Sequence, residues 1–176
     1  MKRLLAAALF SAAVILSLGG TAAAQSTRTY SLINGDALSP ASPSYDPSGA
    51  PAYSGGLVAG QLAGGVGGVF TLSITFRGTG AIDPDAGIYG GEIVSPFSSF
   101  VVTENSGRKS VSTSGSIDAG TLTYRLTPDG RAEILSVVSG GLTVWKGQNK
   151  RRTAVGQGTL RYGADAEGTG TIVLTF

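Results

Sequence analysis

The residue types most often used in catalysis are missing from this chain, which contains no histidine and no cysteine. The commonest general base, the thiolate nucleophile and the usual nitrogen and sulfur ligands of metals are therefore excluded. A catalytic site would have to use a carboxylate pair, or Tyr and Arg side chains that line a pocket. We predict no catalytic residue, no cofactor and no metal ligand, and we favour a protein that is not an enzyme.

The closest acidic cluster lies in the segment AIDPDAGIYGGE. It contains Asp83 and Asp85, and Glu92 ends it. Carboxylate oxygens bind calcium, but the glycine and the glutamate do not fall where an EF-hand loop places them. Since Asp and Pro are common turn residues, we interpret Asp-Pro-Asp as a reverse turn with solvated carboxylates.

A basic cluster in the segment KGQNKRR is the candidate contact site. It consists of Lys146, Lys150, Arg151 and Arg152. The flanking segments have strand patterns, so the cluster is expected at the tip of a hairpin loop. Such a loop suits anionic lipid headgroups or acidic polysaccharide, and a purely solubilising loop is the alternative. The neighbouring Trp145 is expected in the core or at its rim.

The first 24 residues have the pattern of a secretory signal peptide. Lys2 and Arg3 precede an apolar run, 4–18, and Ala22-Ala23-Ala24 forms an A-x-A cleavage site. Cleavage removes two of the 13 basic residues and leaves 11 against 11 acidic ones. This balance gives no reason to expect a nucleic-acid partner. We expect an exported protein in the periplasm, outside the cell or on the cell surface.

Alternating apolar and polar residues predict β-strands in the rest of the chain. The clearest alternation is in VFTLSITFR, 69–77, and TLTYRLT and QGTLRYG repeat it. Asp129-Gly130 predicts a turn into a strand at AEILSVV. Further strands are expected at 29–34, 99–105, 110–117, 141–147 and 171–176. No helical period follows the signal.

This pattern predicts an all-β, antiparallel fold. We favour a small, glycine-rich β-barrel of about eight to nine strands, with a β-sandwich as the alternative. The 28 glycines suit the bends and bulges of a small barrel. Residues 25–56 are expected to hold a strand and a Pro/Ser/Gly-rich loop or arm, and residues 57–176 the barrel. Within the barrel, 57–68 is interpreted as a glycine-rich strand or close-packed crossing.

The last segment, GTGTIVLTF, places Ile172, Leu174 and Phe176 on one face of a strand. In a soluble barrel all three point into the core. The export signal, the lack of cysteine and the terminal aromatic residue resemble outer-membrane β-barrel proteins, and that resemblance implies an apolar face turned to lipid. The aromatic content of 7% is low for two membrane girdles. Many predicted strands are also shorter than the ~9–11 residues of a membrane crossing.

Three classes of function remain open. We favour an exported soluble or cell-surface-associated domain that acts as a binding or structural module. The alternatives are an eight-stranded outer-membrane barrel, and a small barrel that is an enzyme or carries a small apolar ligand.

Overall fold

The computed structural model describes residues 25–64, 67–146, 153–163 and 168–176, so the predicted signal peptide lies outside the described residues. The described residues form ten strands and no helix. The strands are β1 (Thr27–Ser39), β2 (Ser42–Ser44), β3 (Ala52–Leu62), β4 (Gly68–Asp83), β5 (Ile88–Ile93), β6 (Ser99–Ser106), β7 (Lys109–Leu126), β8 (Ala132–Lys146), β9 (Thr153–Gly163) and β10 (Gly170–Thr175). In the described part of the chain, no helix has the length and hydropathy needed to cross a membrane.

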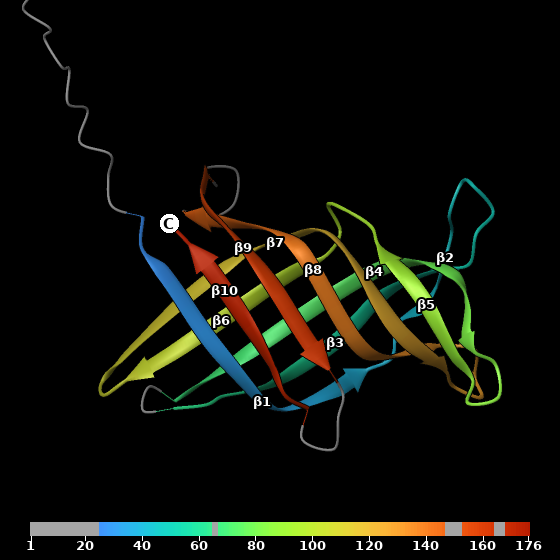
Figure 1. The fold of residues 1–176 in the computed structure, drawn as a ribbon, viewed down its shortest axis with the longest axis horizontal. Helices are drawn as coiled ribbons and strands as arrows, with labels where there is room; N and C mark the ends of the chain where they lie inside the picture. The colour runs from blue at the N-terminus through green and yellow to red at the C-terminus, as the bar shows by residue number, and fades with distance from the viewer. Residues whose placement is uncertain (1–24, 65–66, 147–152, 164–167) are drawn as a thin grey trace, which may run out of the picture.

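The strands belong to one antiparallel sheet that closes in a ring of eight (Figure 1). The ring runs β1-β3-β4-β5-β7-β8-β9-β10 and returns to β1. β6 shares the position of β5, because both pair with the long strands β4 and β7, at different heights. β2 extends the position of β1 along β3. The prediction of an all-β, antiparallel fold is confirmed, and the ring fits a barrel or a sandwich.

Apolar side chains fill the interior of the ring. In β4, Phe70, Leu72, Ile74 and Phe76 are completely buried, and the intervening Thr and Ser residues are only partly buried. Leu122, Leu160 and Leu174 are buried on β7, β9 and β10 in the same way. The alternation therefore places apolar side chains inside and hydroxyl side chains outside.

Strand β10 joins the last residues of the chain to the first strand. It pairs with β1 on one side and with β9 on the other. Ile172 and Leu174 are completely buried, as predicted for a soluble barrel. Phe176 differs from that prediction, because it is only half-buried at the rim, where the Arg28 guanidinium lies 5.8 Å from its ring centroid.

Residues 35–56 contain more strand than the predicted loop or arm. β1 continues to Ser39, β2 follows, and β3 starts at Ala52, so only short connections remain. The prediction of a long loop was therefore wrong. Ala41 is completely buried and exchanges two backbone hydrogen bonds, of 2.7 and 2.8 Å, with Ala132 of β8. Of the segment 57–68, predicted as a glycine-rich strand or a close-packed crossing, residues 57–62 belong to strand β3.

Predicted strands are also longer or joined in the structure. The two segments expected at 110–117 and 121–127 form the single strand β7, and β8 likewise joins two predicted strands. The Asp129-Gly130 turn between β7 and β8 is confirmed, since Gly130 has a φ of 78° and donates its N–H to the Thr127 carbonyl at 2.9 Å.

The connection between β2 and β3 is held by a buried carboxylate. Asp46 Oδ2 accepts a 2.7 Å hydrogen bond from Arg77 Nε, and Oδ1 accepts hydrogen bonds from the Ser48 hydroxyl and the Ser48 N–H at 2.5 and 2.7 Å. These interactions, of which the Ser48 hydroxyl contributes most, lower the pKa of Asp46 from 3.8 to about 2. A folded-state pKa below the unfolded value means that ionised Asp46 stabilises the fold above about pH 4, and that this contribution is lost as the pH falls towards 2.

We expect Asp46→Asn to lower the melting temperature at about pH 6, because the substitution removes the negative charge that pairs with Arg77. The difference from the unaltered protein should shrink as the pH is lowered from about 4 to about 2. Thermal melts followed by circular dichroism across this range test the expectation, with Asp85→Asn in the exposed 84–87 turn as the control. A difference that stays constant with pH contradicts it.

Candidate functional site

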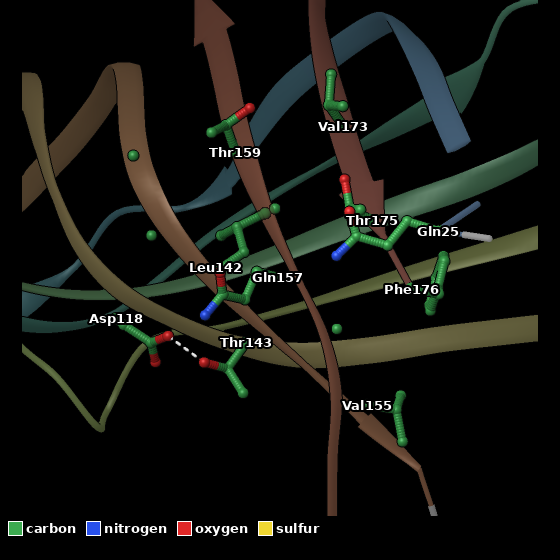
Figure 2. A pocket seen from close by; sticks show the side chains of 14 residues that line it. Gln25, Asp118, Leu142, Thr143, Val155, Gln157, Thr159, Val173, Thr175 and Phe176 are labelled. Atoms are coloured by element: carbon green, nitrogen blue, oxygen red, sulfur yellow. Dashed lines mark hydrogen bonds between the residues drawn. The ribbon is translucent and has the colours of Figure 1, made fainter. Parts of the chain in front are cut away.

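A groove of about 630 Å³ crosses the outer face of the ring over β7, β8, β9 and β10 (Figure 2). Its polar side chains come from five strands or their ends, and its apolar ones lie mainly towards the β9–β10 side. We call it the β7–β10 groove. Its shape follows from bulges in β7 and β8 and from alternate glycines in β9.

Bulges in β7 and β8 form one wall of the groove. The pairing register of β7 with β8 shifts on both sides of Ala119, opposite Gly140 and Gly141. The buried Ser139 joins the two bulges, because its hydroxyl donates to the Ala119 carbonyl at 2.5 Å and accepts from the Gly141 N–H at 3.2 Å. A bulge re-aims the side chains beside it, and here it places Asp118 at the edge of the groove.

Alternate glycines in β9 form the floor. A Cβ atom at Gly156 would overlap the Thr175 carbonyl oxygen, and one at Gly158 would overlap the Val173 carbonyl oxygen. These positions therefore require the absence of a side chain. The residue between them, Gln157, projects on the outer face.

A row of polar side chains crosses the groove from strand to strand. Directly opposed residues on adjacent strands connect Ser116, Thr143, Gln157, Thr175 and Thr27. Opposed residues of an antiparallel sheet share one face and lie ≈ 4.5–5.5 Å apart at Cβ. The row presents four hydroxyls and one amide over five strands, a span of about 19 Å at the usual strand spacing.

Asp118 anchors one end of this row. Its carboxylate accepts a 2.5 Å hydrogen bond from the Ser116 hydroxyl and another from the Thr143 hydroxyl, drawn in Figure 2. At the other end, the hydroxyl oxygens of Thr27 and Thr175 lie 3.5 Å apart. Side chains that are already held in place lose little further freedom when they bind a ligand.

Apolar side chains flank the polar row. Val155 and Val173 lie on β9 and β10, and Phe176 closes the groove beside Gln25 (Figure 2). Arg28, whose guanidinium faces the Phe176 ring, also forms a 3.4 Å ion pair with Glu104. The groove thus combines hydroxyls, amides and one carboxylate with a few apolar contacts and a nearby cation.

The groove presents mainly uncharged hydrogen-bonding groups. Asp118 is the only carboxylate among the described residues that line the groove, whereas glycoside hydrolysis uses two. Hydroxyl and amide groups both donate and accept hydrogen bonds, which is what a ligand rich in hydroxyls requires. The groove therefore offers a surface for a polyhydroxyl ligand.

Comparison of the chain with protein families, with curated proteins and with solved structures gives no match.

Only one residue of the predicted basic cluster lies within the described residues. Lys146 is exposed at the end of β8 and pairs with Thr153, the first residue of β9. Lys150, Arg151 and Arg152 lie outside the described residues. The strands on either side of the segment 147–152, β8 and β9, pair antiparallel, and both line the groove.

The acidic cluster forms the predicted turn. β4 ends at Asp83, whose Oδ1 accepts a 3.1 Å hydrogen bond from the Ala86 N–H, and the Gly87 N–H donates to the Pro84 carbonyl at 3.2 Å. Among the residues that the structure describes, no group of three or more acidic side chains is arranged to hold a metal ion. Trp145 is half-buried on the outer face of β8, which agrees with rim packing.

The residues of the polar row were not singled out from the sequence. Each is an outward Thr, Ser or Gln in an alternating strand, and many such residues occur along the chain. Only the register between strands brings Thr143, Gln157 and Thr175 into line. Gly156 and Gly158 are among the glycines that were expected to suit bends and bulges, and they are the sequence signal for the close approach that forms the floor.

Proposed function

We propose that the protein is an exported, non-catalytic binding module whose β7–β10 groove holds a segment of an acidic polysaccharide. The observation that carries the proposal is the row of hydroxyl and amide side chains across five strands. It is continuous with a groove, and two of its residues, Thr143 and Gln157, lie on the hairpin that carries the basic segment. Polysaccharide hydroxyls match the row, and its acidic groups match the cations.

The orientation of the sheet supports a domain that is stable in water. The four residues Phe70, Leu122, Leu160 and Leu174 would face lipid in an outer-membrane barrel, and all four are at most 3% exposed. On β4, the outward residues that alternate with the buried ones from Phe70 to Phe76 are Thr and Ser, which are poor surfaces for a bilayer core. We therefore favour the soluble or surface-associated domain over the membrane barrel.

A polysaccharide is favoured over a lipid headgroup because of the shape of the site. A lipid surface needs exposed cations or apolar anchors, and it makes little use of a recessed row of hydroxyls. The row, of which Thr143, Gln157 and Thr175 line the groove, is longer than one headgroup would need, and its central amide belongs to Gln157. Binding to anionic vesicles would therefore be evidence for the alternative, a lipid ligand.

We expect Gln157→Ala to weaken binding to polygalacturonate about tenfold, since up to two hydrogen bonds at ≈ 0.5–1.5 kcal/mol each are lost. Affinity electrophoresis of the protein without its signal segment, in gels with and without polygalacturonate, measures this. Gln61→Ala is the matched control, because Gln61 is an exposed glutamine on β3 outside the groove. Replacing Lys150, Arg151 and Arg152 with Ser should weaken retention further at low salt, each charge being worth on the order of 1 kcal/mol.

Equal retention of the two glutamine variants would show that the groove does not hold the polysaccharide. Retention that depends on the three basic residues alone, together with binding to phosphatidylglycerol vesicles, would assign the protein to anionic lipid instead. Neutral dextran in the gel separates recognition of acidic groups from general retention by sugars.

A further inference from the structure

In Figure 1, β5 lies at the opposite end of the ring from the C-terminus. A second pocket, of about 370 Å³, lies beside β5 and is formed with residues of β3, β4 and β7. It is lined by Tyr53, Tyr89 and Tyr124, with Pro51 and Leu126 beside them and the 78–81 segment of β4 as its wall. We call it the tyrosine pocket. Its volume falls in the range of small-molecule sites.

The three tyrosines extend an aromatic stack from the core to the pocket. The rings of Tyr53 and Phe76 lie 5.1 Å apart at 25°, and those of Tyr89 and Tyr124 lie 5.6 Å apart at 26°. Tyr53 and Tyr124 are 5.3 Å apart and link the two pairs. Tyr53 and Tyr124 are buried, whereas Tyr89 is only half-buried at the outer end of the stack. These stacking distances are the ones at which aromatic rings attract.

Glycines in β4 leave two positions of the pocket wall, 78 and 80, without a side chain. A Cβ atom at Gly78 would lie 2.8 Å from the Tyr124 hydroxyl oxygen. Gly80 has a φ of 128°, and a Cβ there would meet no atom within 4 Å. The register of β4 with β5 shifts between these two glycines. The backbone thus bends beside the tyrosines and leaves space in front of them.

The Tyr124 hydroxyl remains neutral at physiological pH. Burial first, and then the neighbouring Tyr53 hydroxyl, raise the pKa of Tyr124 to about 12. A neutral phenol both donates and accepts a hydrogen bond. Among the described residues that line the pocket there is no charged side chain, no amide and no carboxylate. A sugar ring usually needs such groups, so the ring faces and phenol hydroxyls favour a different ligand.

We propose that the tyrosine pocket binds a small uncharged aromatic molecule that carries a hydroxyl group. Its ring continues the stack on Tyr89, and its hydroxyl hydrogen-bonds to the tyrosine hydroxyls. This site does not depend on the β7–β10 groove or on the proposed polysaccharide ligand, because the two share no lining residue and only β7, among the described strands, contributes to both.

The test is an amide-resolved NMR titration of the protein without its signal segment, with p-cresol as the probe. We expect saturable shifts at Tyr53, Tyr89, Tyr124 and Gly80, with a dissociation constant on the order of 1 mM, as a fragment-sized ligand reaches. Methyl α-glucopyranoside, added in the same way, should leave these signals unchanged.

Tyr89→Leu removes the outer ring but keeps an apolar side chain, and it should raise the dissociation constant for p-cresol at least about tenfold. Tyr45→Leu is the matched control, because Tyr45 is 85% exposed and lies outside the pocket, and it should leave binding unchanged. Leu126→Trp, which fills the pocket from its rim, provides a second test if Tyr89→Leu unfolds. Absence of saturable shifts, equal binding by these pocket variants, or shifts with the glucoside alone would overturn the proposal.

Discussion

Phe70→Ala is expected to destabilise the fold by about 3–5 kcal/mol, the usual cost of truncating a buried Phe. Phe70 is completely buried, and its ring lies 6.2 Å from that of Tyr162. Gly35 and Gly60 also lie against this ring, since Cβ atoms there would come within 3.0 and 2.6 Å of it. Neither glycine has a side chain that could fill the cavity. For a domain of this size the melting temperature should fall by roughly 6–20 °C.

Val69→Ala is the matched control for this experiment. Val69 precedes Phe70 on the same strand and is 49% exposed on the outer face. Its truncation should cost about 0.5 kcal/mol or less, as for other surface substitutions. Chemical denaturation measures both variants. If Val69→Ala costs as much as Phe70→Ala, the inward and outward faces of β4 have been assigned the wrong way round.

Gly115→Ala should cost about 3 kcal/mol, at the upper end of what overpacking causes. A Cβ atom at Gly115 would overlap the Thr143 carbonyl oxygen and would lie 2.7 Å from the ring of Phe100. The Thr143 backbone belongs to β8, which pairs with β7 at this point, so it cannot move away without loosening the ladder. The added methyl group therefore separates the two strands.

Gly141→Ala tests whether this effect is specific. A Cβ atom at Gly141 would meet its nearest neighbour, the Ala119 nitrogen, at 3.7 Å, which is an ordinary contact. Its replacement should be neutral, or stabilising by about 0.4–1 kcal/mol through the unfolded chain. Equal losses for the two variants in thermal unfolding would contradict the close packing of β7 on β8.

The fold class could be predicted because the inward positions of the best strands hold large apolar residues. Phe70 to Phe76 in β4 alternate with Thr and Ser, and this period of two has one physical origin, burial of one face. The Asp129-Gly130 turn was equally clear, since glycine readily adopts its positive φ.

The apolar–polar alternation that predicts a strand was weak where small residues occupy the inward positions. Ala41 is completely buried, and a Cβ at Gly56 or Gly60 would come within 2.6 Å of Ile134 or Phe70. These positions are core, but a hydrophobicity pattern does not register glycine or alanine as strongly as Phe or Leu. The strands around 35–56 were therefore mistaken for a loop.

The candidate sites depend on long-range register, which the sequence pattern does not contain. Gln157 lies in the groove because β8 and β10 pair with it at Thr143 and Thr175. Tyr53 and Tyr124 come together because β3 and β7 both flank the β4–β5 pair. Local alternation indicates which face a residue occupies, but it cannot indicate which residue lies opposite on the next strand.

The most direct test of the proposed function is to map the residues that respond when an oligogalacturonate is titrated into the isotopically labelled protein. The account predicts saturable amide shifts at Asp118, Thr143, Gln157 and Thr175, along the polar row of the groove. The shifts should weaken as salt is added, because cations contribute to binding. Saturable shifts confined to another face, or no saturable shift at low salt, would contradict the assignment of the groove as the ligand-binding surface.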